Sequence, residues 1–229
     1  MSDSLPLFDG LPKADIPWGR RLVLASGSPR RRQLLVAAGY EFEILPASDA
    51  AECGMCSRET APELVARYTF RKAADVAKKV TARFSDAMIL AADTVASCHG
   101  QILGKPVDVD HAREMLTMLS GNPHDVYSGV CLWDAPTSRC TVDVVRTQLV
   151  MTPLTPEMLE EHLESMRWEG KAGAFGFQDG NEWLSIVGGG SPSNVVGLPM
   201  ERLTELLESF DSIAETVDIG GAKYDRLAD

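Results

Sequence analysis

RLVLASGSPRRRQLLVAA, residues 21–38, carries the first folding unit of the chain. Its opening run, residues 21–25, is short and apolar and predicts a buried strand. A Ser-Gly-Ser-Pro turn follows, and residues 30–38 then place Leu34 and Leu35 on one side of a helix. A strand that runs directly into a helix is the unit from which α/β folds are built.

The same two patterns alternate along the rest of the chain. Apolar runs predict further strands at residues 42–47, 87–92, 126–133 and 140–149. Capping residues and helical spacing predict helices at residues 60–82, 108–121, 155–166 and 199–210. The first of them begins with a capping box of Thr60 and Glu63, and either Asp108 or Asp110 caps the second. A turn at Asp134-Ala135-Pro136 joins the last two strands into a hairpin. We therefore predict an α/β fold, with a mixed twisted sheet and flanking helices.

No Pro-rich or Gly-rich linker divides the chain into separate domains. The first twenty residues contain Pro6, Pro12 and Pro17 among mixed charges, which favours a flexible N-terminal arm over residues 1–20. We expect a single domain over residues 21–210 and a C-terminal tail over residues 211–229.

Composition excludes several classes of protein. The net charge of −11 is unsuited to general binding of nucleic acid, because phosphate contacts need Lys and Arg. No apolar run reaches the roughly 18 residues typical of a membrane span, and the N-terminus lacks the pattern of a secretory signal. An anionic ligand would therefore need a local basic pocket, a divalent cation, or both.

The cysteines favour a reducing compartment. There are five of them, an odd number without a signal pattern, so we expect reduced thiols and a cytoplasmic protein. Cys53 and Cys56 form one C-x-x-C, but a structural zinc site needs a second pair of ligands and none follows at matching spacing. Two ordinary thiols in a loop are the simpler interpretation.

The Ser-Gly-Ser-Pro turn is followed by Arg30, Arg31 and Arg32 in the first turn of a helix. Free backbone N–H groups at a helix start bind anions, whereas basic side chains there oppose the helix dipole unless an anion balances them. Arg32 alone is consistent with a solvated position. Arg30 and Arg31, beside Ser26, favour a phosphate site.

Of three other polar positions, Asp93 and Lys72 each leave two interpretations open. Asp93 follows the strand at 87–92, where α/β sheets place their chemistry, but it is equally consistent with a cap of the next turn. Lys72 lies beside the apolar side of a helix, where it either extends its charge to solvent or points into a cleft. Lys105 lies in a Gly-Lys-Pro loop whose spacing is not that of a Walker motif.

Gln178 closes a glycine-rich segment at residues 170–178. Its amide offers a donor and an acceptor side by side, which matches one edge of uracil or thymine. A glycine-rich turn with an exposed Gln is the alternative interpretation.

Together these segments resemble the Maf family of nucleotide pyrophosphatases. The resemblance covers residues 21–210 and includes LASGSPRRRQLL at 24–35, AADT at 91–94, LSG at 119–121, SGV at 128–130, GKP at 104–106, KAGAFGFQ at 171–178 and SNVVGLPM at 193–200. It implies a cleft between two lobes, a fold shared with the inosine triphosphate pyrophosphatases. It also implies a homodimer and a requirement for Mg²⁺ or another divalent ion such as Mn²⁺.

The resemblance also implies roles for individual residues. Asp93 matches the family's proton acceptor. Around the triphosphate, the matching residues are Ser26, Arg30, Arg31, Lys72 and Lys105. The branch acting on dTTP and UTP carries Arg, Thr and Gln where this chain has Arg30, Thr94 and Gln178, whereas the 7-methyl-GTP branch has Trp, Gln and Glu.

One position departs from the family pattern. The family places an acidic pair in the loop before the long helix, and here that loop has Glu52 followed by Cys53. We expect Glu52 and Asp93 to hold the metal.

The expected activity is hydrolysis of dTTP or UTP, or of modified pyrimidine nucleotides, to the monophosphate and pyrophosphate. Two alternatives remain: a purine-directed enzyme of the inosine triphosphate class, and a non-catalytic nucleotide-binding regulator of cell division.

Overall fold

The fold is known from a computed structural model that describes residues 8–52, 54, 58–80, 85–180 and 182–216. Cys53 and Cys56 lie outside the described residues. The strands are β1 (Arg21–Leu24), β2 (Phe42–Ile44), β3 (Ala87–Cys98), β4 (Gln101–Leu103), β5 (Pro123–Asp134), β6 (Arg139–Met151), β7 (Leu184–Ile186) and β8 (Glu215–Thr216). They form one sheet in the order β2–β1–β3–β5–β6–β7, with β4 added to β3 and β8 added to β6.

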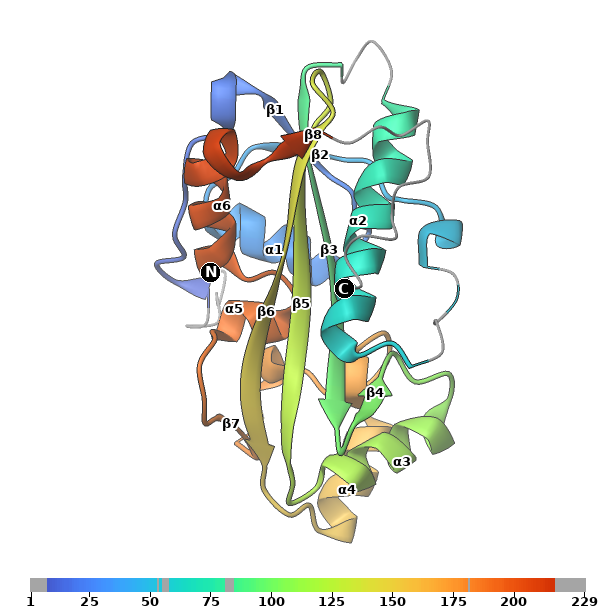
Figure 1. Cartoon of the computed structure of the whole chain (residues 1–229). Coiled ribbons are helices and arrows are strands. Elements are labelled where there is room, and N and C mark those ends of the chain that lie inside the picture. Colours follow the sequence, from blue (N-terminus) through green and yellow to red (C-terminus); the bar gives the residue numbers. More distant parts are fainter. Residues whose placement is uncertain (1–7, 53, 55–57, 81–84, 181, 217–229) are drawn as a thin grey trace.

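Helices cover both faces of this sheet (Figure 1). The α-helices are α1 (Pro29–Ala37), α2 (Ala61–Lys79), α3 (Val109–Leu119), α4 (Pro156–Glu164), α5 (Pro192–Val196) and α6 (Met200–Ile213). The 3-10 turns are η2 (Pro17–Gly19), η3 (Asp49–Glu52), η4 (Ala172–Ala174) and η5 (Phe177–Asp179). The predicted mixed α/β fold is therefore confirmed. No helix among the described residues has the length and apolarity needed to cross a bilayer.

The sheet is mixed because its two halves are built differently. β1 runs parallel to β2 and β3, whereas β3, β5, β6 and β7 pair antiparallel. The long β5–β6 hairpin spans the molecule (Figure 1). One end of the sheet packs between α2 on one face and α1 and α6 on the other, while α3 and α4 enclose a separate apolar cluster at the other end.

The helix starts follow their local sequence. Thr60 and Glu63 form the expected capping box at α2, with the Thr60 N–H donating to Glu63 Oε2 at 2.7 Å. At α3 the sequence left Asp108 and Asp110 as alternative caps. Asp108 is the cap, since its carboxylate accepts the His111 N–H at 2.8 Å.

The strand predicted at residues 87–92 is the first part of a longer one. β3 continues without a break to Cys98, because Asp93 pairs with Gly129 of β5 and the residues beyond it also pair with β4. The pairing of β3 with β1 does stop at Leu90, opposite Leu24. Asp93 thus lies just beyond the carboxyl end of β1, in the middle of a long strand.

The segments at both ends of the described chain are part of the folded domain. Ala14 is buried, and Phe8, Leu11 and Ile16 pack against the core on the α6 side of the sheet. The segment expected to be a loose arm is therefore packed from Phe8 onward. At the other end, α6 runs past the expected boundary at residue 210, and β8 pairs with β6.

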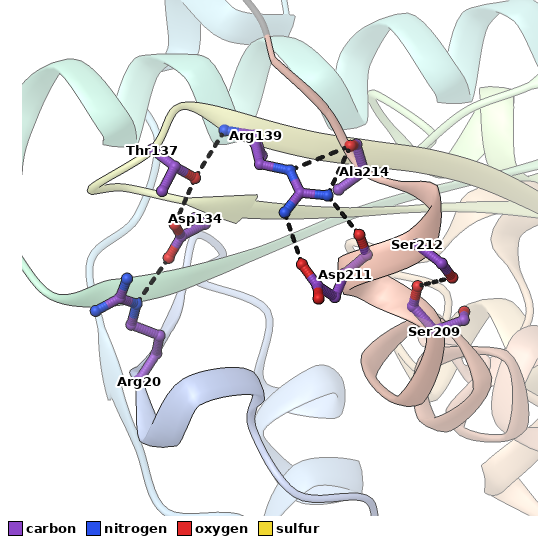
Figure 2. Close-up of polar contacts among 8 residues, drawn as sticks. All are labelled: Arg20, Asp134, Thr137, Arg139, Ser209, Asp211, Ser212 and Ala214. Carbon is purple, nitrogen blue, oxygen red and sulfur yellow. Dashed lines mark hydrogen bonds and ion pairs between the residues drawn. The ribbon is translucent and has the colours of Figure 1, made fainter.

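Ion pairs fix both segments to the tip of the β5–β6 hairpin (Figure 2). The Arg20 guanidinium donates to the fully buried Asp134 at 2.9 Å. Arg139 donates to the Asp211 carboxylate at 2.8 Å and to the Ala214 carbonyl at 3.3 Å. The hairpin tip is thus held from both termini of the domain.

Candidate active site

A pocket of about 510 Å³ opens at the carboxyl end of β1. Its wall combines the turn before α1, the η3 loop, the middle of β3 and the glycine-rich segment from Glu169 to Gln178. Eight of the residues singled out by sequence line this one pocket: Ser26, Arg30, Arg31, Glu52, Asp93, Thr94, Lys105 and Gln178.

A second pocket, of about 590 Å³, lies at the other end of β1. Three of its cations already have protein partners: Lys13 donates to the Gly39 carbonyl, Arg20 to Asp134, and Arg21 lies 3.7 Å from Glu43. None of the predicted site residues lines it, so the predicted site lies in the pocket around Asp93.

Lys72, on α2, contacts two carboxylates of the pocket lining. The residue is 4% exposed, and its ammonium lies 2.7 Å from Glu52 Oε1 and contacts Asp93 Oδ1 as well. Of the two interpretations left open by sequence, the structure shows the cleft-facing one. Two carboxylates thus converge on one buried cation.

Glu52 is charged at neutral pH in this environment. Burial alone would raise the pKa of its carboxyl, but the hydrogen bond from Lys72 and the charges of Lys72, Lys105 and Arg31 outweigh it and lower the pKa. The loop that carries Glu52 is anchored to α2, since the Ser48 N–H and hydroxyl both donate to Asp75.

Arg31 joins three elements through one guanidinium. Its Nε donates to the Gly197 carbonyl at 2.8 Å, its Nη1 to Ser26 Oγ at 3.0 Å, and its Nη2 to Thr94 Oγ1 at 3.2 Å. Burial lowers the pKa of Arg31, and the nearby Asp93 opposes that shift. Three of the five N–H groups of the guanidinium, one on each nitrogen, thus donate to protein acceptors, so much of this side chain's hydrogen bonding is structural.

Arg30 reaches across the pocket instead. Its Nη2 donates to the Gly170 carbonyl at 2.7 Å, which connects α1 to the glycine-rich segment. Burial lowers the pKa of Arg30, and the charge of Asp179 works in the opposite direction. Arg30 therefore bridges the two walls of the cleft.

Thr94 leads to polar residues that the sequence analysis did not assign. The Thr94 hydroxyl lies 2.8 Å from Ser128 Oγ. The Ser128 hydroxyl donates to the backbone carbonyl of Asn194 at 2.9 Å. Ser128 and Asn194 are fully buried. Both fall in the motif blocks at 128–130 and 193–200, but their contact with Thr94 depends on the pairing of β3 with β5.

The glycine-rich segment is fastened to the loop that carries Lys105. The Gly173 N–H donates to the Gly104 carbonyl at 3.0 Å. Lys171 and Asp179 form an ion pair inside the same segment, and both were missed by sequence reasoning. Lys105 and Gln178 are thereby placed on neighbouring walls of one pocket.

The carboxylates of the pocket suit a hard divalent cation. Asp93 and Glu52 supply oxygen ligands, and Mg²⁺ is commonly held by one or two carboxylates together with substrate phosphates and water. Among the residues that the structure describes, no group of three or more His, Cys, Asp or Glu side chains is arranged to hold a metal alone. The donor set therefore fits an ion that arrives with an anionic ligand.

Comparison with known families agrees with this arrangement. The sequence model of the family described as Maf-like protein matches residues 21–210. This chain belongs to the Maf family.

Three relatives show how far the similarity extends. A protein of Rhodopirellula baltica named dTTP/UTP pyrophosphatase is 62% identical over 215 residues, which cover 92% of this chain and 93% of that protein. Proteins of the same name from Geotalea uraniireducens and Acetivibrio thermocellus are 39% and 40% identical, and the aligned residues cover 84% and 83% of this chain. In those two proteins the alignment covers 96% and 95% of the length.

Proposed function

We propose that this Maf protein hydrolyses dTTP and UTP to the nucleoside monophosphate and pyrophosphate. The observation that carries the proposal is the pocket in which Arg30, Arg31 and Lys105 face the carboxylates of Asp93 and Glu52. A triphosphate brings about four negative charges, which an acidic protein accommodates only where cations are concentrated. The relatives named dTTP/UTP pyrophosphatase support the same reaction.

Asp93 is the general base of this mechanism. Its carboxylate orients a water molecule and accepts its proton as the oxygen attacks the α-phosphorus. The bond between the α-phosphorus and the bridging oxygen breaks, and pyrophosphate leaves. Lys72, in contact with Asp93, holds that carboxylate in position before attack.

The cations act on the leaving group. Little covalent chemistry is needed from the protein in this class of reaction, so positioning and charge stabilisation dominate catalysis. Arg30 and Lys105 both line the pocket and contact the phosphates, and Arg31, together with Ser26, completes the cradle at the start of α1. The phosphate chain thus lies along the helix start, as the charge pattern of the sequence predicts.

Asp93 and Glu52 would hold a divalent cation, Mg²⁺ or Mn²⁺. The ion would neutralise phosphate charge that the side chains leave uncompensated. Selection of the base falls to Gln178 and Thr94. The amide of Gln178 complements the N–H and carbonyl edge of a uracil or thymine ring.

The protein is further proposed to act as a cytoplasmic homodimer that binds neither nucleic acid nor membranes. The net charge of −11 supports the exclusion of nucleic acid. The family resemblance supports the dimer, which light scattering of the purified protein would measure.

The test is a substrate panel. Purified protein is mixed with dTTP, UTP, 7-methyl-GTP and ITP in the presence of Mg²⁺, and pyrophosphate release is measured. We expect release from dTTP and UTP, and loss of that activity on adding EDTA. Preference for ITP would indicate the purine-directed class instead, and binding of dTTP without turnover would indicate a regulator.

Asp93→Asn tests the catalytic assignment. Removing a general base costs about 100-fold or more in kcat. Asp110→Asn is the matched control, because Asp110 is exposed in the first turn of α3 and is not part of the pocket lining. Equal rates for wild type and Asp93→Asn would contradict the mechanism.

A further inference from the structure

We infer that the ion pair between Lys171 and Asp179 is a specificity-determining device that positions Gln178 for the nucleobase. The inference rests on the proposed function, because it concerns how that pocket selects its substrate. Neither residue is the proposed base, metal ligand or base reader.

The pair is built into the wall of the pocket. The Lys171 ammonium contacts Asp179 Oδ2, and each side chain is only 11% exposed. The two residues are eight positions apart and close a small loop that contains η4 and the start of η5. Lys171 and Gln178 both line the pocket, and Gln178 immediately precedes Asp179.

The first half of this loop is fixed by other contacts. Gly170 accepts from Arg30 at 2.7 Å, the Gly173 N–H donates to Gly104 at 3.0 Å, and the Ala174 carbonyl lies 2.9 Å from His162 Nε2. Lys171 therefore projects from an anchored segment. Its pairing with Asp179 transfers that anchoring to η5, which carries Gln178.

Gly176 shows how closely the chain passes the pair. A Cβ atom at this position would lie 2.5 Å from Asp179 Oδ2 and 2.7 Å from Lys171 Nζ. Any side chain at position 176 would consequently push the two charges apart. Gly176→Ala thus opens the ion pair while it keeps both charged residues in the chain.

A simpler role for Asp179 makes a different prediction. Asp179 is also the carboxylate whose charge acts on Arg30. If it served only to balance the cations of the pocket, its loss would change the binding of every polyphosphate to the same extent, whatever the base. If the ion pair positions Gln178, its loss weakens the binding of a nucleotide through its base. The binding of a polyphosphate that has no base then stays unchanged.

The experiment therefore separates base from phosphate. For wild type, Gly176→Ala and Asp179→Asn, KM and kcat are measured with dTTP and dCTP, together with the inhibition constant of tripolyphosphate, which has no base. Gly189→Ala is the control, since a Cβ there meets no atom within 4 Å and the glycine is not in the pocket lining. Asp134→Asn, which breaks the buried pair with Arg20 at the hairpin tip (Figure 2), controls for the general loss of an ion pair.

We expect Gly176→Ala to raise KM for dTTP about fivefold to tenfold, the cost of one lost hydrogen bond to the base. Its kcat and its inhibition constant for tripolyphosphate should stay within about twofold of wild type, and its preference for dTTP over dCTP should shrink. Asp179→Asn should reduce that preference by a similar factor. The two controls should keep the wild-type preference.

Two results would overturn the inference. One is a parallel change of KM and of the tripolyphosphate constant in Gly176→Ala, which would assign the pair to the phosphate site. The other is an unchanged preference for dTTP in that variant. Calorimetry of dTTP and dCTP binding to the same variants in an Asp93→Asn background measures the base preference without turnover. Absence of pyrophosphate release by the wild type would contradict the proposed function, and it is thereby distinguished from a failure of this inference.

Discussion

Arg31→Lys tests the claim that this guanidinium joins three elements of the site. Arg31 donates through Nε, Nη1 and Nη2 to acceptors on the turn after α5, on the turn before α1 and on β3. A lysine ammonium keeps the positive charge but is a single nitrogen on a flexible stem. We expect it to retain one of the three hydrogen bonds.

The magnitude follows from the two bonds that are lost. A hydrogen bond to a charged group contributes about 1.5 kcal/mol or somewhat more to the free energy of unfolding, so two bonds amount to about 3 kcal/mol. Arg31 is 8% exposed, and little solvent is therefore available to replace them. With a urea m-value of about 2.5 kcal/mol/M, the unfolding midpoint should fall by about 1 M.

Urea denaturation followed by tryptophan fluorescence measures this shift. Arg32→Lys is the matched control, because Arg32 is the next residue of α1 and is exposed. Surface changes of that kind stay within about 0.5 kcal/mol. If the two variants unfolded at the same urea concentration, the structural role assigned to Arg31 would be refuted.

Two further outcomes are expected. Gly129→Ala should lower the free energy of unfolding by about 1–3 kcal/mol, because its Cβ would lie 2.5 Å from Thr69 Oγ1 and 2.8 Å from the Val65 carbonyl of α2; a melting temperature equal to that of Gly189→Ala would contradict this. Burial lowers the pKa of His124, against the opposing hydrogen bond to the Asn122 carbonyl. The unfolded chain then binds more protons than the folded one, so stability should fall as pH drops below about 6.5. Melting temperatures measured from pH 8 to pH 5 should fall less steeply below pH 6.5 in His124→Gln than in the wild type. Equal slopes in the two proteins would show that His124 does not titrate on unfolding.

Local signals in the sequence determined much of the fold. The run from Arg21 through the Ser-Gly-Ser-Pro turn predicts β1 and α1, which the structure places at 21–24 and 29–37. The capping box at Thr60 and the hairpin turn at Asp134 are correct for the same reason. Caps, turns and periodicity depend on residues a few positions apart, so a single sequence contains them in full.

The continuity of β3 through Asp93 and Thr94 was not available from such signals. The polar pair Asp93-Thr94 looks like the end of a strand, because polar residues usually interrupt a buried apolar run. In the structure the strand continues, since β5 and β4 supply hydrogen-bonding partners on both sides. Partners that lie tens of residues away in the chain leave no local trace.

The sequence by itself determined which residue types the site has: cations at a helix start, a carboxylate after an apolar run and an amide in a glycine-rich segment. Only the tertiary structure decided that Lys72 points at Asp93 and Glu52, that Ser128 meets Thr94, and that Lys171 closes on Asp179. The physical reason is that side-chain direction and strand register are set by packing between distant segments. Spacing along the chain specifies an element's own geometry, but not the element it packs against.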